Sequence, residues 1–172
     1  MISKFGYRAC VGLAALALSG SMIGLPAVAE TPSAIHIDVP VVLKEAKVVM
    51  NMDSAPPANG MPIGLRHMMM MTDRFKKSGT NWKMVAVFSG PGGDMLLSDE
   101  KYNELKWTKT GNPYKALISQ LVARGVQVEE CAVTMKANGW TNKDLLPIAK
   151  VNAGGEVRLV ALVQQGYVLL QD

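Results

Sequence analysis

The segment Trp82-Lys-Met-Val-Ala-Val-Phe-Ser89 decides the fold class of this 172-residue sequence. Its centre, Met84 to Phe88, consists of five apolar residues in succession, so both faces of the predicted strand are apolar. A strand that is buried on both faces belongs to a parallel sheet with helices on each side. We therefore expect an α/β protein.

Further strands and helices alternate along the chain on either side of this strand. The other strands are predicted at 47–53, 126–131, 148–151 and 167–171. Helices are predicted at 61–77, 112–124, 142–146 and 155–165, with a helical turn at 99–103. This alternation implies right-handed crossovers. It predicts a three-layer flavodoxin-like sandwich with a five-stranded, mostly parallel sheet in the strand order 2-1-3-4-5.

The first 29 residues have the pattern of a bacterial secretory signal peptide. Lys4 and Arg8 precede the apolar run Ala9–Leu25, and Ala27 and Ala29 occupy the two positions that signal peptidase reads as small. We expect cleavage after Ala29 and a periplasmic protein, with a retained membrane anchor as the alternative. Beyond the signal we predict an extended arm at 30–43, containing a strand near 36–39, and one α/β domain at 44–172.

Cleavage would leave Cys131 as the single cysteine, because Cys10 lies within the signal. No later apolar stretch approaches the roughly 18 residues of a membrane span, so we expect no membrane contact after cleavage. The formal charge of +4 is spread along the chain without a run of four basic residues, and no nucleic-acid partner is expected. A lone thiol in an oxidising compartment is either buried and inert or present for its reactivity.

Open α/β sheets bind ligands beyond the carboxyl ends of their strands, where the strand order reverses. In the order 2-1-3-4-5 this crevice lies between the first and third strands. Asn51 and Asp53 would line one side of it and Cys131 the other. Asp53 could orient a ligand or a water molecule, or could be a solvated strand end.

Several segments together resemble the DsrE/DsrF-like family of sulfur-relay proteins. The central match is Gly111-Asn-Pro-Tyr114 followed by Leu117-Ile118, Leu121, Gly125-Val126 and Cys131. The further matches are Lys47-Val-Val-Met-Asn51, Leu97-Ser-Asp99, Tyr102-Asn103, Asp144-Leu-Leu-Pro147 and Gln165-Gly-Tyr167. The resemblance covers residues 39–172, and the chain looks like an exported member of the family.

This resemblance implies a flavodoxin-like sandwich, assembly into trimers or hexamers, and a cysteine that carries sulfur as a persulfide. The family cysteine after the third strand matches Cys131. The chain departs from its secreted relatives at Ser89-Gly90, where they often have His-Gly. Any role of that histidine in proton transfer or anion binding is therefore in doubt here. Cytoplasmic relatives pass sulfur for tRNA modification, a role that a secreted member cannot share. Its sulfur donor and acceptor therefore differ from those of the cytoplasmic relatives.

Sulfur transfer requires a thiolate, and a helix N-terminus after the third strand would lower the pKa of Cys131. Glu129 and Glu130 act in the opposite sense, because negative charge disfavours a thiolate. Strand alternation points Glu130 away from the cysteine and leaves Glu129 on the same side. The alternative is a cysteine that packs as a small apolar residue.

The loop Ser89–Gly93 follows the second strand and is rich in glycine. Its backbone amides, beginning at Ser89 and Gly90, could form a nest for an anion such as thiosulfate or sulfite. It lacks the Lys-Ser/Thr ending of a phosphate loop. The alternative interpretation is a flexible turn.

The segment His67-Met-Met-Met-Met71 contains ligand types that suit Cu(I). At helical spacing Met68 and Met69 face the core, while the histidine, Met70 and Met71 face outward. A copper site would have its ligands split between two faces, so we favour core packing plus an outward apolar patch. An outward methionine pair predicts a subunit interface.

We predict a periplasmic sulfur carrier that acts through a persulfide on Cys131, with sulfurtransferase-like activity at most. The alternatives are a non-enzymatic oligomeric module that binds a small anion or a partner protein, and Met-dependent copper binding. The expected partners are copies of the chain, a sulfur donor, an acceptor and a redox partner. No hydrolase motif or zinc ligand set is present, and no cofactor is expected.

Overall fold

The computed structural model describes residues 35–57 and 60–172, so the predicted signal peptide and its cleavage site lie outside the described residues. The chain divides into two units, Met1–Val39 and Pro40–Asp172. In the described part of the first unit, the His36 imidazole lies 3.6 Å from the Asp38 carboxylate and both side chains are exposed. The strand predicted near 36–39 is wrong, because these exposed residues have no strand conformation.

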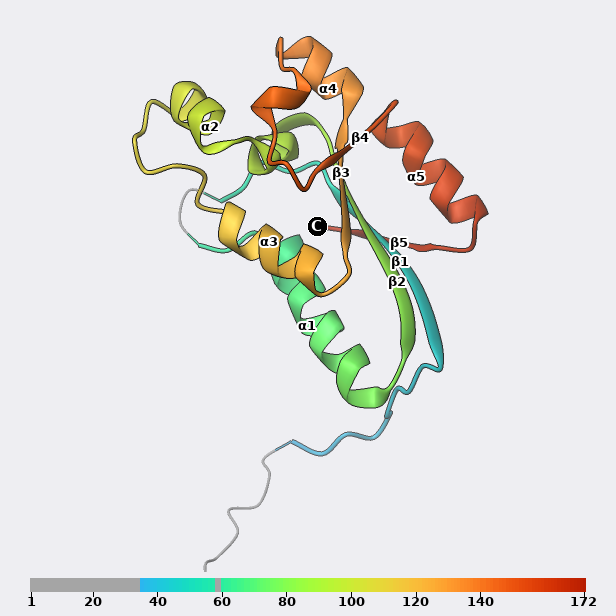
Figure 1. The fold of residues 1–172 in the computed structure, drawn as a ribbon. Helices are drawn as coiled ribbons and strands as arrows, with labels where there is room; N and C mark the ends of the chain where they lie inside the picture. The colour runs from blue at the N-terminus through green and yellow to red at the C-terminus, as the bar shows by residue number, and fades with distance from the viewer. Residues whose placement is uncertain (1–34, 58–59) are drawn as a thin grey trace, which may run out of the picture. The chain divides into compact units, whose positions relative to one another are not determined.

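The second unit contains a five-stranded sheet in which all neighbouring strands are parallel (Figure 1). The strands are β1 (Glu45–Met52), β2 (Asn81–Phe88), β3 (Gln127–Cys131), β4 (Lys150–Asn152) and β5 (Val168–Gln171). Each lies within about three residues of its predicted position.

The observed strand order, β4-β3-β2-β1-β5, shows that the predicted order 2-1-3-4-5 is wrong. β2 lies between β1 and β3, and Phe88 pairs with Met52 on one side and Glu130 on the other. The physical reason is burial. The predicted order would place β2 at an edge of the sheet, whereas Met84–Phe88 is apolar on both faces and is buried throughout. A central position covers both faces of such a strand.

Helices cover the sheet on both faces, as the three-layer prediction requires (Figure 1). α1 (Ile63–Ser78) and α3 (Lys115–Ala123) lie on one face, and α5 (Gly155–Gln164) lies on the other. Shorter elements surround the carboxyl ends of the strands. They are the 3-10 helices η1 (Gly90–Leu96) and η2 (Asn142–Asp144) and the helices α2 (Asp99–Lys106) and α4 (Ala132–Ala137).

The helix-boundary signals in the sequence are confirmed in part. Gly79 ends α1 with a left-handed φ of 68°. Asn112 accepts a hydrogen bond from the Tyr114 amide at 2.9 Å, but α3 begins only at Lys115. The buried Asn112 amide also donates to the carbonyls of Met95 and Leu97, so it ties the start of α3 to η1.

The hydrophobic core is unequal on the two faces of the sheet. The α1/α3 face holds a cluster of sixteen buried residues that includes Leu65, Met68 and Leu121. The α5 face holds four: Val49, Val85, Val87 and Leu162. α5 therefore covers its face with a much thinner apolar layer.

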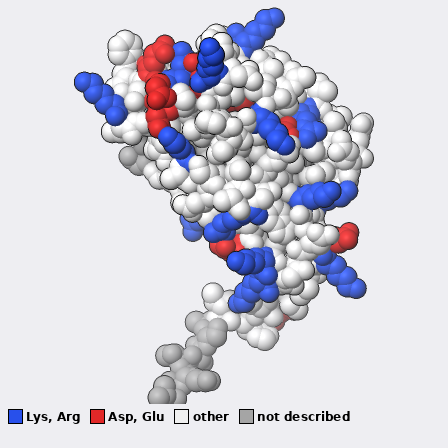
Figure 2. All heavy atoms as spheres, in the orientation of Figure 1, with Lys and Arg blue, Asp and Glu red and all other residues white. Residues whose placement is uncertain are grey.

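Lys and Arg side chains are spread over the face shown in Figure 2 and do not form one continuous patch. Within residues 35–57 and 60–172, we find no helix of the length and hydrophobicity needed to cross a membrane.

Candidate functional site

Cys131 is the last residue of β3 and the N-terminal cap of α4. Its thiol is free, and the residue is only 2% exposed. The Sγ atom accepts a hydrogen bond from the backbone N–H of Gly155, the first residue of α5, at 3.1 Å. The sulfur therefore lies where β3 ends and where two helices, α4 and α5, begin.

Thr134, in the first turn of α4, links the cysteine to the loop after β2. Its hydroxyl oxygen accepts from the Gly90 amide at 2.8 Å. Its backbone N–H and its hydroxyl both hydrogen-bond to the Cys131 thiol. Gly90, Thr134 and Cys131 thus belong to one chain of hydrogen bonds at the carboxyl edge of the sheet.

Burial raises the pKa of the Cys131 thiol, but the hydrogen bonds from Thr134 and Gly155 lower this pKa by more. The net pKa lies below its ordinary value. Hydrogen bonds from backbone amides at a helix start favour the thiolate, because they point partial positive charge at the sulfur. The local geometry therefore favours a reactive form of the cysteine.

Gly155 permits this close approach. A Cβ atom at this position would lie 3.1 Å from the Cβ of Ser89 and 3.7 Å from the Cβ of Cys131. The start of α5 therefore rests directly on the ends of β2 and β3. Ser89, Gly90 and Cys131, three of the predicted site residues, are brought together here.

Glu129 shares the α5 face with Cys131, as strand alternation predicts, but its charge is neutralised. The Arg158 guanidinium of α5 donates to both carboxylate oxygens of Glu129 at 2.8 Å. Burial raises the pKa of Glu129, and the bonds from Arg158 and Gln127 lower it to a value below its usual range. This carboxylate is thus ionised and paired, so it disfavours the Cys131 thiolate less than an unpaired charge would.

Glu130 faces away from the sulfur, toward η1, and is fully buried. Burial is the main cause that raises the pKa of Glu130 to about 8. The bond from the Cys131 amide lowers this pKa, and the charges of Cys131 and Asp94 raise it. Its Oε1 accepts from that amide at 3.1 Å, and its Oε2 is buried without a hydrogen-bond partner among the described residues. Glu130 therefore carries a proton at neutral pH and adds little negative charge beside the thiol.

Asn51 and Asp53 do not join this cluster. The Asn51 amide donates to Asp53 at 3.0 Å and to Gln171 at 2.9 Å, and Gln171 donates to Asp53 at 2.8 Å. These residues form a polar group at the ends of β1 and β5, and β2 separates them from Cys131. The predicted crevice between β1 and β3 is therefore wrong, because it rested on the wrong strand order.

The connections between strands change from one face of the sheet to the other near the β4 edge. The connections after β1 and β2 pass over the α1/α3 face, whereas the connection after β4 passes over the opposite face as α5 (Figure 1). Cys131 pairs with Asn152 of β4 at this divergence. The cysteine thus lies at the switch point that this topology creates.

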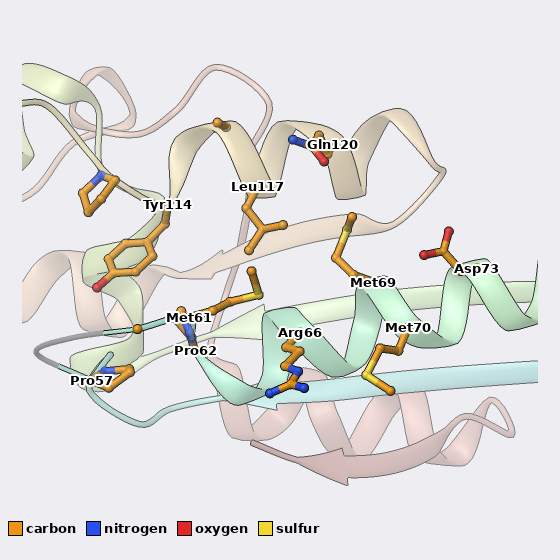
Figure 3. A pocket seen from close by; sticks show the side chains of 13 residues that line it. Pro57, Met61, Pro62, Arg66, Met69, Met70, Asp73, Tyr114, Leu117 and Gln120 are labelled. Carbon is orange, nitrogen blue, oxygen red and sulfur yellow. The ribbon is translucent and has the colours of Figure 1, made fainter. Parts of the chain in front are cut away.

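The large surface hollows lie away from the cysteine. A hollow of about 950 Å³ separates α1 from α3, and Met61, Met69 and Leu117 project into it (Figure 3). A hollow of about 260 Å³ on α5 is lined by Gly154 and Arg158 among others, and Gly154 directly precedes the residue whose amide bonds to the Cys131 sulfur. The described residues hold no group of three or more His, Cys, Asp or Glu side chains arranged to bind a metal ion.

Sequence reasoning missed the contributions of Thr134, Gly155 and Arg158. Thr134 is three residues after the cysteine, a position whose backbone N–H is free in the first turn of a helix, so this signal was readable. The pair Gly154-Gly155 before a helix is a weaker signal of close approach. The sequence around Arg158 gives no indication of its ion pair with Glu129, because this pairing depends on how α5 crosses the sheet.

Comparison with known proteins agrees with this architecture. The protein of unknown function MTH1491 from Methanobacterium thermoautotrophicum is 19% identical with a TM-score of 0.58, and the YchN protein from E. coli is 15% identical with a TM-score of 0.54. Each alignment covers 74% of this chain and 99% of the other. At these identities the likeness shows the fold alone.

A search of curated protein sequences finds no match. The profile of the DsrE/DsrF-like family matches residues 47–171, which include all five strands except the first two residues of β1. The chain therefore belongs to the DsrE/DsrF-like family.

Proposed function

We propose that this protein is an exported sulfur carrier that holds sulfane sulfur as a persulfide on Cys131. The observation that carries the proposal is the position of Sγ at the start of α5, where it accepts the Gly155 amide at 3.1 Å. The lowered pKa of the thiol agrees with a nucleophilic role. Family membership supports the class of chemistry.

In the proposed loading step, the Cys131 thiolate attacks the sulfane sulfur of a donor. With thiosulfate, a new S–S bond forms to Cys131 while the donor S–S bond breaks, and sulfite leaves with the bonding electron pair. In the unloading step, an acceptor thiolate attacks the outer sulfur of the persulfide. The sulfur leaves with the acceptor, and the Cys131 thiolate is restored without any net oxidant.

The burial of Cys131 favours a second candidate, a binding module in which the cysteine only fills space. A thiol that is 2% exposed meets a donor only when the start of α5 moves. The sulfur-carrier proposal therefore requires local opening of this helix, whereas the binding-module function does not.

The deciding experiment compares the intact mass of the purified protein before and after exposure to polysulfide or thiosulfate. We expect the wild-type protein to gain one sulfur atom, which a reductant removes, and the Cys131→Ser variant to gain none. The same samples are treated with an alkylating reagent in native buffer and in denaturant. A thiol that forms no adduct and reacts only after unfolding would exclude the sulfur carrier and leave the binding module.

Thr134→Val provides a matched test of the geometry. It keeps the shape of the side chain but removes the hydroxyl that bonds to the thiol and accepts the Gly90 amide. We expect the pH at which Cys131 becomes reactive to rise, because one bond that stabilises the thiolate is lost. An unchanged pH profile would show that this bond does not tune the thiol.

The proposal places the protein in the periplasm after cleavage behind Ala29. The starting mass of protein isolated from a periplasmic fraction tests this directly, since the mature chain would begin at Glu30. We also propose assembly into a trimer or hexamer. Exposed apolar residues on α5, Val157 and Val160, offer a surface for it, and light scattering of Val157→Glu with Val160→Glu tests that surface.

A further inference from the structure

The outward face of α1 carries three soft donor side chains that the proposed function does not use. His67, Met70 and Met71 stand at positions i, i+3 and i+4 of the helix, so they are neighbours on its surface. All three line one hollow of about 620 Å³, which Leu170 of β5 borders on the other side. One imidazole and two thioethers therefore share one hollow.

The structure removes the objection that such ligands are divided between two faces. Met68 is fully buried in the core, and Met69 points toward α3 while Met70 points away from it (Figure 3). The buried methionines are thus occupied by packing. Met71 is partly buried against the same core cluster, but it also lines the hollow. The histidine, Met70 and Met71 therefore form a set of three ligands there.

Exposure also marks Met70 as unusual. This residue is 59% exposed, at a helix position where a polar side chain would be equally well accommodated. Methionine is flexible, with three rotatable bonds, so thioethers four residues apart or less can turn toward a shared ion. Thioether and imidazole together select Cu(I) over the hard divalent cations.

We propose that His67, Met70 and Met71, brought together along the hollow beside Leu170, form a surface site for Cu(I). The ion is coordinated by one imidazole nitrogen and two thioether sulfurs, all neutral donors. The site lies on the helix face of the sheet opposite α5, so it is separate from Cys131 and gives the protein a metal-carrying role beyond sulfur transfer.

The charged groups at this hollow favour a monovalent ion over a divalent one. Arg74 and Lys77 line it, and Asp73, which also lines it, is held by Arg124 at 2.6 Å. The repulsion from two cationic side chains doubles when the bound ion carries two charges instead of one. The surroundings therefore disfavour Zn²⁺ and Cu²⁺ more than Cu(I).

The test is an anaerobic Cu(I) titration against a chromophoric chelator, in a Cys10→Ser and Cys131→Ser background. Removing both cysteines ensures that no thiol in the precursor or the processed chain binds the metal. We expect one Cu(I) per chain. His67→Asn, Met70→Leu and Met71→Leu should each weaken binding by at least the roughly tenfold that losing an outer-shell partner costs.

Met69→Leu is the matched control, since it removes a thioether from the same helix but from the side facing α3. We expect its Cu(I) affinity to equal that of the parent. Leucine keeps the apolar surface, so a loss in Met70→Leu reports the sulfur donor and not a disturbed contact. The proposal is wrong if the parent binds no Cu(I), or if Met70→Leu and Met71→Leu bind as tightly as Met69→Leu.

A second readout does not depend on affinity. Ag(I), which shares the ligand preference of Cu(I), is added to protein labelled with ¹³C at the methionine methyl groups. We expect the signals of Met70 and Met71 to shift in NMR spectra and those of Met68 and Met69 to stay. Equal shifts across all methionines would mean unspecific binding and would overturn the site.

Discussion

The two faces of the sheet differ in how firmly they are covered. Sixteen buried residues join the sheet to α1 and α3, whereas four form the cluster under α5. Cys131 lies under the thinner layer, at the start of α5. Regions with few buried apolar contacts open at lower free energy than the rest of a domain. Under the proposed function, local opening of α5 would let a sulfur donor reach the buried thiol while the rest of the fold stays intact.

The contacts that hold α5 down are also different in kind. Leu162 is the only residue of α5 in the buried cluster, and the bidentate Arg158–Glu129 pair ties the helix to β3. The outer surface of the helix carries exposed valines at 157, 160 and 163. The ion pair, Leu162 and the partly buried Leu159 are thus fewer contacts than those under α1, so we expect α5 to open at lower free energy.

The largest expected effect is the loss of stability when a buried side chain of the larger core cluster, between the sheet and α1, is truncated. Leu65 of α1 is fully buried, and Leu65→Ala should lower the free energy of unfolding by about 4 kcal/mol. Leu162→Ala removes the same atoms from the thin layer, which collapses more easily around the cavity, and should cost about 2 kcal/mol. Urea unfolding followed by circular dichroism measures both. Equal losses would contradict the difference between the faces.

The adjacent glutamates of β3 give an intermediate effect that depends on pH. Glu130 holds its proton when folded, since burial raises its pKa to about 8 from an ordinary value of 4.5. Between these values the folded state binds more protons than the unfolded chain, so stability falls as the pH rises. We expect a fall on the order of 3 kcal/mol from pH 5 to pH 9, and Glu130→Gln should abolish it.

Glu129 should behave in the opposite sense, because pairing with Arg158 holds its pKa below its usual range against the effect of burial. Its contribution is present above the unfolded pKa and is lost as the pH falls through the folded value. Urea midpoints across the pH range separate the two residues. An alkaline loss of stability that persists in Glu130→Gln would assign the titration to another group.

The strands β1, β2 and β5 were predictable because each contains a local run of apolar residues. The strand order was predicted wrongly because it followed the usual flavodoxin-like order, although the doubly apolar run Met84–Phe88 already favoured a central position for β2. The cluster of Ser89, Gly90 and Cys131 follows only once β2 is placed beside β3, because neighbouring parallel strands bring their carboxyl ends together. The Gly155 amide at the thiol and the Arg158 pair with Glu129 could not be predicted, since both depend on how α5 crosses the sheet.

The smallest expected effect tests the opening itself. If Cys131 becomes accessible through lifting of α5, Leu162→Ala should raise its rate of alkylation in native buffer by about tenfold, which corresponds to about 1.4 kcal/mol. Leu65→Ala is the control, because it weakens the fold more but leaves the cover over the thiol intact. Its alkylation rate should match wild type, since global unfolding remains rare without denaturant. A rate that follows global stability in both variants would mean that the thiol reacts only when the whole domain unfolds, and the thin layer would then have no part in access to Cys131.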